Sequence, residues 1–83
     1  AGSTNTTGVN NTYLGYNSTA DANNYNNSTA LGYQATITHS DQIVLGQTTN
    51  APTVFIPGKV GIGIDNPDSV YAVDIDGGVW TVV

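Results

Sequence analysis

Hydrophobic and polar residues alternate along the first half of the chain with the period of two that predicts β-strands. In the clearest stretch, Thr29, Leu31 and Tyr33 alternate with Ala30 and Gly32. Breaks rich in Asn, Ser and Asp separate such stretches and predict turns. No apolar run has helical spacing, and the abundant Gly, Asn and Thr residues are poor helix formers. The pattern therefore predicts an all-β chain with almost no helix.

A short phrase occurs three times, as Tyr13-Leu14-Gly15-Tyr16, Ala30-Leu31-Gly32-Tyr33 and Val44-Leu45-Gly46-Gln47. The glycines of successive copies are 17 and 14 residues apart. This period is too short for a helical hairpin but suits one coil of a β-solenoid that carries two short strands. Such a coil cannot bury its apolar residues alone, so we expect it to pack on neighbouring coils or on other chains.

The pattern changes after Gly46, where apolar stretches alternate with turns containing Pro, Gly, Asn and Asp. Glycine at alternate strand positions there allows another backbone or a ring to approach closely. We predict four strands in this part, at residues 53–56, 59–64, 70–75 and 79–83. The chain is thus divided into a lead-in at 1–9, which could be a cloning remnant, head repeats at 10–50, and a four-stranded unit at 51–83.

Composition makes a self-sufficient monomer difficult. A chain of 83 residues and 8.6 kDa buries a small fraction of its surface and usually depends on disulfides, a metal or oligomerisation. The absence of cysteine removes the disulfide route. A net charge of −5 with one Lys and no Arg argues against nucleic-acid binding. No apolar run is long enough to span a bilayer, so we expect no membrane insertion.

Two segments resemble known families. Residues 27–35, Asn-Ser-Thr-Ala-Leu-Gly-Tyr-Gln-Ala, resemble the head repeat of trimeric autotransporter adhesins, which centres on Ala-Leu/Ile-Gly and forms a trimeric left-handed β-roll. Residues 58–67, followed by 72–79, resemble a phrase of viral tail-fibre and attachment proteins. The first repeat departs from the adhesin pattern because Tyr13 occupies the position of a small residue. The resemblance implies a homotrimer of β-roll-like head repeats followed by a small β-prism, on the surface of a virion or a bacterium.

A trimer would give the repeated leucines a place to be buried. Three chains that close around an axis would cover Leu14, Leu31 and Leu45 and leave no open sheet edge. Full burial of one leucine side chain is worth ~1.5–3 kcal/mol. We therefore expect the chain itself to be its first partner.

Tyrosines are the candidate receptor contacts, because their rings combine an apolar face with a polar tip that suits sugars and proteins. Tyr16 and Tyr33 follow the glycine in equivalent repeat positions, so we expect them to stack on one face of successive coils. The alternative is an aromatic ladder that only stabilises the strands. The candidate residues are Tyr13, Tyr16, Tyr25 and Tyr33.

The other chemistry-bearing residues give weaker predictions. His39 is the only imidazole, and Asp41 shares its strand face, but no nucleophile motif, glutamate pair or cysteine accompanies them. Three copies of His39 on a threefold axis could bind a metal or an anion. Oxygen-rich turns could hold a cation, although none follows the twelve-residue calcium loop, and turn formation is the alternative. These turns contain Asp65, Asp68, Asp74 and Asp76. We expect no cofactor.

The leading hypothesis is a non-enzymatic attachment module of a trimeric viral fibre that presents a surface for a host receptor, a glycan or a protein, from the virion. The alternatives are a bacterial trimeric adhesin head and a purely structural shaft or trimerisation segment without a ligand. A polysaccharide depolymerase would need a carboxylate pair in a groove, and no pattern in the chain selects one.

Overall fold

The computed structural model describes residues 1–66 and 73–75, and within these ranges the regular structure consists of strands with no helix. The strands are short, with two or three residues each. This confirms the predicted all-β class. The strands are β1 (Thr12–Leu14), β2 (Thr19–Ala20), β3 (Thr29–Leu31), β4 (Thr36–Ile37), β5 (Ile43–Leu45), β6 (Val60–Ile62) and β7 (Val73–Ile75).

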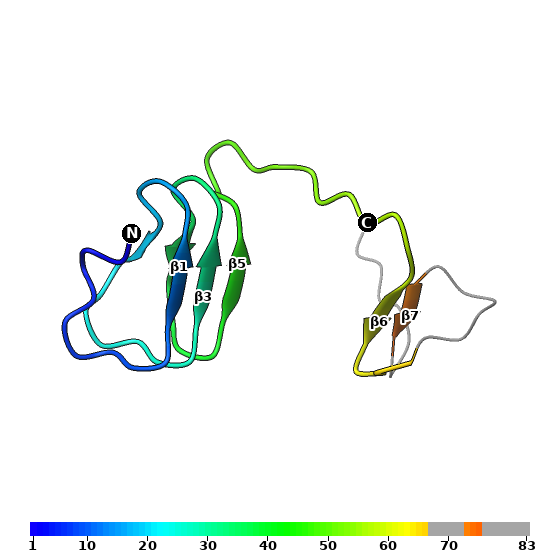
Figure 1. Ribbon diagram of the computed structural model, residues 1–83, viewed down its shortest axis with the longest axis horizontal. Coiled ribbons are helices and arrows are strands. Elements are labelled where there is room, and N and C mark those ends of the chain that lie inside the picture. The colour runs from blue at the N-terminus through cyan, green and yellow to red at the C-terminus, as the bar shows by residue number, and fades with distance from the viewer. Residues whose placement is uncertain (67–72, 76–83) are drawn as a thin grey trace, which may run out of the picture.

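The first five strands form two parallel sheets that the chain visits in turn. One sheet has the order β1-β3-β5 and the other pairs β2 with β4, so each return to a sheet completes one coil (Figure 1). The register places Leu14 opposite Leu31 and Leu31 opposite Leu45, at offsets of 17 and 14 residues. These are the spacings of the repeated phrase, so the sequence repeat is one coil of the fold. We call β1 to β5, with their connections, the coil stack.

Backbone conformation explains why the strands are shorter than the alternation predicted. Gly15 and Gly32 end β1 and β3 with φ of 129° and 116°, a region that side chains other than hydrogen rarely permit. Two residues further on, Asn17 and Gln34 have φ of 58° and 56° and turn the chain toward the second sheet. The corner of each of the first two coils is therefore set by a glycine and an amide residue.

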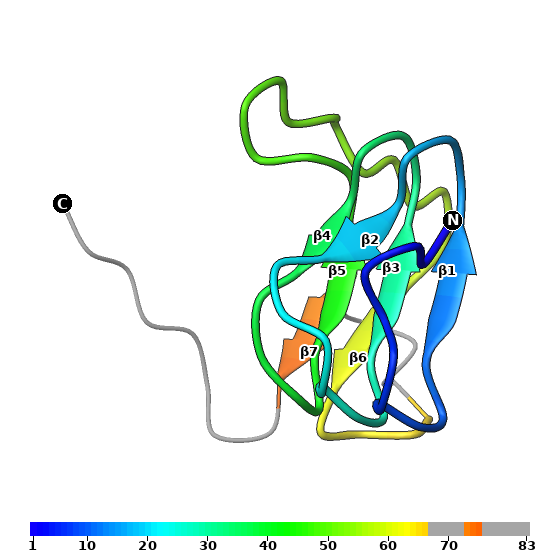
Figure 2. The same cartoon turned by 90° about the vertical axis from the view of Figure 1, so that its left-hand side faces the viewer.

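The core lies between the two sheets and is made of small side chains. Ala30, Ala35 and Ile37 are fully buried, and Ala20 is nearly so. β4 packs against β3 and β5, and Figure 2 shows the two sheets lying over one another. Alanine at the centre lets the sheets approach closely, with Ile37 as the one large side chain that is completely enclosed. Only a modest apolar volume is available to stabilise one chain.

Asparagine-rich turns hold successive coils together at their edge. The Asn10 side chain donates to Asn27 Oδ1 at 3.2 Å, and the Asn27 side chain donates to Asp41 Oδ1 at 3.2 Å. All three residues have left-handed backbone conformations, with φ between 56° and 61°. Asn and Asp tolerate this region better than other non-glycine residues. We call the hydrogen-bonded row Asn10, Asn27 and Asp41 the asparagine ladder, and it explains why these residue types occur at the turns.

Buried polar groups are also paired from coil to coil. Ser28 is almost fully buried, and its hydroxyl donates to the carbonyl oxygens of Asn26 and His39. The same oxygen accepts from the Gln42 backbone N–H at 3.1 Å, while the Ser28 N–H donates to Asn11 Oδ1 at 2.9 Å. Burial of a serine is tolerated because its groups are hydrogen-bonded.

The N-terminal segment covers the first coil. The Gly2 N–H donates to the Ser18 carbonyl at 2.7 Å, and the N–H groups of residues 6–8 donate to the Asn23 carbonyl. Gly2 also lies against the ring of Tyr13, so closely that a Cβ at this position would meet it. Residues 1–9, predicted as a lead-in, therefore pack on the coil stack rather than standing apart from it.

One predicted strand is wrong. Residues 53–56 are rich in β-forming side chains, yet the structure has them outside any strand, in the extended segment that links the coil stack to β6 (Figure 1). Val54, Phe55 and Ile56 are exposed. A strand needs a hydrogen-bonded neighbour, and no part of the described chain lies beside this segment as one. High β-propensity alone does not supply a partner.

The second half shows two of the four predicted strands. The predicted strand at 59–64 is present as β6, and its Val60 pairs with Val73 of β7 in parallel. The prediction at 70–75 is met at its described end, Val73–Ile75. The remainder of that strand and the prediction at 79–83 lie outside the described residues.

Candidate functional site

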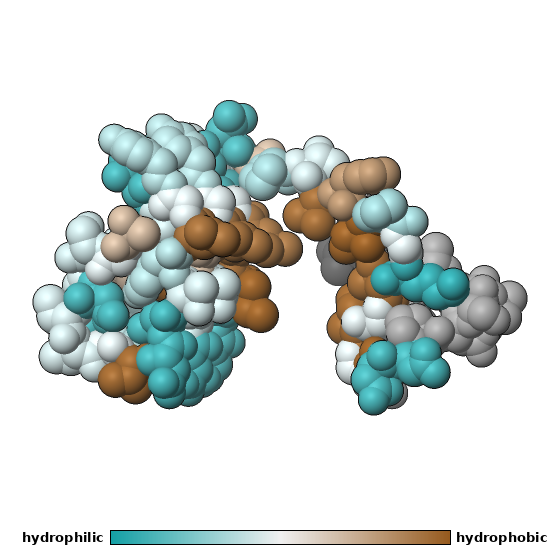
Figure 3. Space-filling view, viewed as in Figure 1, coloured by the Kyte–Doolittle hydropathy of each residue, from teal (hydrophilic) through white to brown (hydrophobic). Residues whose placement is uncertain are grey.

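The outward side of the three-stranded sheet is apolar. The middle residues of β1, β3 and β5 point into the coil, so their neighbours point out. Leu14, Leu31 and Leu45 are 62, 41 and 48 % exposed, and Ile43 is 73 % exposed. Figure 3 shows hydrophobic side chains in a row across the coils. We call these four side chains the leucine face. Contiguous exposed apolar surface of this kind is typical of an interaction site.

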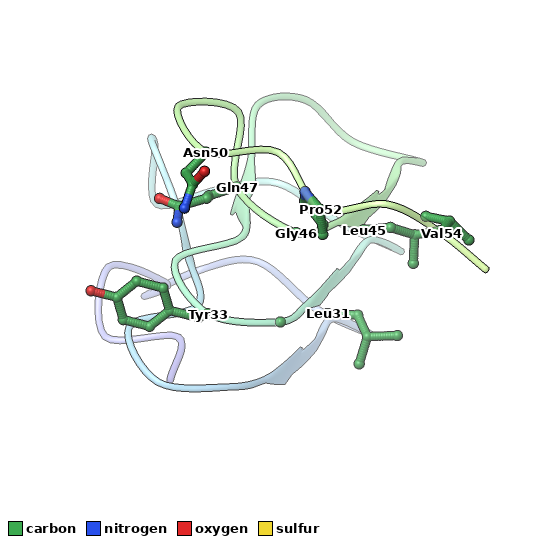
Figure 4. A pocket seen from close by; sticks show the side chains of 9 residues that line it. Leu31, Tyr33, Leu45, Gly46, Gln47, Asn50, Pro52 and Val54 are labelled. Atoms are coloured by element: carbon green, nitrogen blue, oxygen red, sulfur yellow. The ribbon is translucent and has the colours of Figure 1, made fainter.

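An apolar groove continues the leucine face toward the linking segment. Leu31 and Leu45 form one part of its wall and Val54 another, around a volume of about 330 Å³ (Figure 4). The ring of Pro52 lies directly against Gly46, where a Cβ would clash with it. Glycine at this third copy of the repeat therefore lets the linking segment fold back and form the groove.

Tyr16 and Tyr33 stack, as the repeat predicted. Their ring centroids are 5.9 Å apart with an interplanar angle of 19°. Both side chains are mostly exposed, at 68 and 55 %. Gln47 takes the equivalent position after Gly46 in the third copy. The pair places two stacked and mostly exposed rings on the surface of the coil stack.

Tyr13 and Tyr25 lie in a different environment. Both are partly buried and pack against the core of the coil stack. The Tyr13 hydroxyl is buried without a hydrogen-bond partner among the described residues. The Tyr25 hydroxyl donates to Asp21 Oδ1 at 2.8 Å, and this hydrogen bond, with burial, raises the pKa of Tyr25 above its usual value. The four candidate tyrosines are thus divided between the surface and the core.

A polar groove lies over the outward side of the β2–β4 sheet. It has a volume of about 430 Å³, and the side chains around it carry hydroxyl or amide groups and no charge. Sequence reasoning missed this groove, although threonine stands four residues after the first two repeat glycines. The lining residues are Asn17, Thr19, Gln34, Thr36, Thr38, Gln47, Thr48 and Thr49.

The histidine and the aspartates are dispersed. His39 is exposed, and its Nδ1 lies 2.9 Å from the Ser40 carbonyl oxygen. Asp41 accepts from Asn27 in the asparagine ladder, and Asp65 is exposed in the turn after β6. Asp74 lies on β7. Within residues 1–66 and 73–75, no three His or Asp side chains are close enough to share a metal ion. The predictions at Asp68 and Asp76 fall outside the described residues.

Comparisons with known proteins return no matching family model, no matching curated protein and no matching solved structure. Among the residues that the structure describes, no helix is long and apolar enough to cross a membrane. Function therefore has to be inferred from the two faces of the coil stack.

Proposed function

We propose that the chain is a homotrimeric, non-enzymatic attachment module in which three copies bring their leucine faces together around a common axis. The observation that carries this proposal is the leucine face itself. The repeat exposes Leu14, Leu31 and Leu45 in one row, and contact between this apolar surface and water is unfavourable. A second and a third copy of the same repeat offer the same row, and closed symmetry lets all three be covered.

The small core supports this assembly. Among the described residues, the buried core consists of three alanines and one isoleucine, whereas four large aliphatic side chains stay exposed on the leucine face. Full burial of a leucine or isoleucine is worth ~1.5–3 kcal/mol, and partial burial proportionately less. Association would therefore remove from water the large aliphatic surface that the folding of one coil stack leaves exposed. The apolar groove beside Val54 would extend the contact.

The finer architecture follows from the resemblance to fibre and adhesin repeats. We assign residues 10–50 to β-roll-like head coils and residues 51–83 to a β-prism-like unit of the same trimer. The parallel coils with offsets of 17 and 14 residues support the first assignment. The parent structure would be a viral fibre on the virion surface, with a bacterial surface adhesin as the alternative.

The receptor surface in this proposal is the exposed tyrosine stack. Tyr16 and Tyr33 offer two stacked and mostly exposed rings, while Tyr13 and Tyr25 are engaged by the core. A trimer would present three such stacks, so that three weak contacts act together and raise the overall affinity. Aromatic faces with a phenolic tip suit the C–H faces and hydroxyls of sugars.

A purely structural shaft is the second candidate, and the same stack favours it. Aromatic pairs on neighbouring strands stabilise a sheet by roughly 0.2–1 kcal/mol without any ligand. A glycan array separates the two candidates. Binding that is lost in Tyr16→Ala and kept in Tyr25→Phe supports attachment, and a chain that remains trimeric but binds nothing supports the shaft.

Solution mass tests the assembly. We expect a species near three times 8.6 kDa by light scattering, and a shift to monomer at low concentration in Leu31→Thr, which keeps a strand-forming residue but removes apolar surface. Val9→Thr is the matched control, because Val9 is also an exposed aliphatic residue but lies on the N-terminal segment. A folded monomer for the unaltered chain at all concentrations would overturn the proposal.

A further inference from the structure

We propose that the polar groove on the β2–β4 sheet binds an uncharged, extended oligosaccharide whose sugar units run from coil to coil. This inference rests on the proposed attachment function and names the ligand class. The groove of about 430 Å³ is large enough to receive part of a short saccharide chain. It lies on the sheet opposite to the leucine face, so assembly through that face leaves it open.

The groove repeats along the coil stack. The first coil contributes Asn17 and Thr19, and the second contributes Gln34 and Thr36 at equivalent positions, with Thr19 opposite Thr36 in the parallel register. Residues 47–49 add a third level. Parallel strands are ~4.8 Å apart, which is close to the length of one sugar unit in an extended β-linked hexose chain. Successive units would therefore meet equivalent side chains.

The chemistry of the lining matches neutral sugars. Hydroxyl and amide groups each donate and accept hydrogen bonds, as the hydroxyls of a sugar do. The aromatic stack adjoins the groove, because Tyr16 and Tyr33 immediately precede Asn17 and Gln34 in their coils. A ring that lies on the stack would direct its hydroxyls toward the amides. An aromatic surface beside hydroxyl and amide side chains is a combination that a saccharide can use fully.

The charge of the protein narrows the class of saccharide that the groove would bind. The groove contains no cationic side chain, and the whole chain has one lysine, Lys59, against six aspartates. A sialylated, sulfated or phosphorylated glycan would bring negative charge to a protein of net charge −5 and find no counter-charge in the groove. The preferred ligand is therefore uncharged.

The test is an NMR titration of the full chain, with backbone amides as probes and with cellobiose, cellotriose, β-1,4-mannotriose and 3′-sialyllactose as ligands. We expect shifts at Thr19, Gln34 and Thr36 with the neutral trisaccharides, tighter binding of cellotriose than of cellobiose, and weaker shifts with 3′-sialyllactose. No saturable shifts with either neutral trisaccharide, or a preference for 3′-sialyllactose, would overturn the inference.

Matched variants locate the contact. The Thr36 hydroxyl donates to the Gln34 carbonyl oxygen at 3.1 Å, so its oxygen is left to accept from a sugar hydroxyl. Thr36→Val keeps the shape and strand preference of the residue but removes this acceptor, and loss of one hydrogen bond should weaken neutral trisaccharide binding about two- to tenfold. Thr29→Val makes the same change on the other sheet and should leave binding unchanged. Equal effects of both variants would overturn the groove assignment, as would binding that Tyr16→Ala abolishes and Thr36→Val leaves intact.

Failure of this inference is distinguishable from failure of the proposed function. A trimer that binds a protein or a charged glycan through the tyrosine stack would retain attachment and refute the polar groove. A monomer that still binds cellotriose with shifts at Thr19 and Thr36 would refute the trimer and support the groove, because the lining residues all come from one chain.

Discussion

The two outward faces of the coil stack are built from the same repeat, yet their surfaces are opposite in character. On the β1-β3-β5 sheet the outward residues are mainly leucine and isoleucine, whereas on the β2–β4 sheet they are threonine with amide residues beside them. The difference cannot come from the core, which both sheets share. In the proposed assembly, one face is covered by protein and the other remains in contact with water or a polar ligand.

The comparison also explains a sequence feature. In the second copy of the repeat, the residue before the leucine is the small Ala30, and close packing of the sheets leaves no room there for a larger side chain. In the first copy, Tyr13 takes this inward position and is accommodated because the N-terminal segment covers the end of the stack. The terminal coil thus differs from the middle one, as expected for a repeat with only one neighbouring coil.

The largest expected effect comes from Ile37→Ala, which removes the one large enclosed side chain that both faces share. We expect a loss of about 2–5 kcal/mol in the free energy of unfolding, measured by chemical denaturation.

Ile43→Ala sharpens the comparison, because Ile43 is exposed on the leucine face. The loss in the free energy of unfolding caused by Ile43→Ala should grow with the degree of association, so this loss should depend on protein concentration. A concentration-independent cost for Ile43→Ala would contradict coverage of that face.

Gly15→Ala is expected to disturb the corner between the two faces. The backbone of Gly15 has φ of 129°, and a Cβ there would clash with the Gly32 carbonyl of the next coil. Strained backbone of this kind costs roughly 1–3 kcal/mol, and the clash adds to it. Thermal unfolding should therefore show a clear drop in Tm.

Gly58→Ala is the control for this change, since nothing lies within 4 Å of a Cβ at that position and its φ is not in the left-handed region. The two substitutions share the same loss of chain entropy in the unfolded state. If Gly15→Ala were as mild as Gly58→Ala, the close approach of successive coils at this corner would be wrong.

The alternation in the sequence predicted the coils but not the character of each face. A period of two shows that Ala30 and Leu31 point to opposite sides, and it does not say which side is inside. Hydrophobicity alone would put the leucine inside, yet the structure buries the alanine and exposes the leucine. The choice depends on how closely the second sheet approaches, which is a tertiary property.

The parts of the site differ in how far the sequence predicts them. The stack of Tyr16 and Tyr33 was predictable because the repeat fixes their equivalent positions. The polar groove was not, because threonine is first of all a strand former and only the fold shows that Thr19 and Thr36 share an outward surface. Residues 53–56 were predicted as a strand because propensity gives no information about a missing partner.

The smallest expected effect concerns the connection from β2 to β3, which links the polar face to the leucine face. Tyr25 in this connection donates to Asp21 Oδ1, and the hydrogen bond raises the pKa of Tyr25 above its usual value of 10.0. The folded chain therefore holds the phenolic proton more tightly than the unfolded chain. The resulting stability is fully present below pH 10 and is lost as the pH rises through the higher pKa of the folded state.

Alkaline titration followed by ultraviolet absorbance should show a late-ionising tyrosine, and this late ionisation should be lost in Tyr25→Phe. Tyr33→Phe is the matched control, because it removes a phenol from the exposed stack and leaves the hydrogen bond from Tyr25 to Asp21 in place. Tyr25→Phe should also make unfolding less sensitive to pH in the alkaline range. If the late ionisation persisted in Tyr25→Phe, the contact with Asp21 would not be its cause, and the connection between the two faces would be looser than its hydrogen bonds indicate.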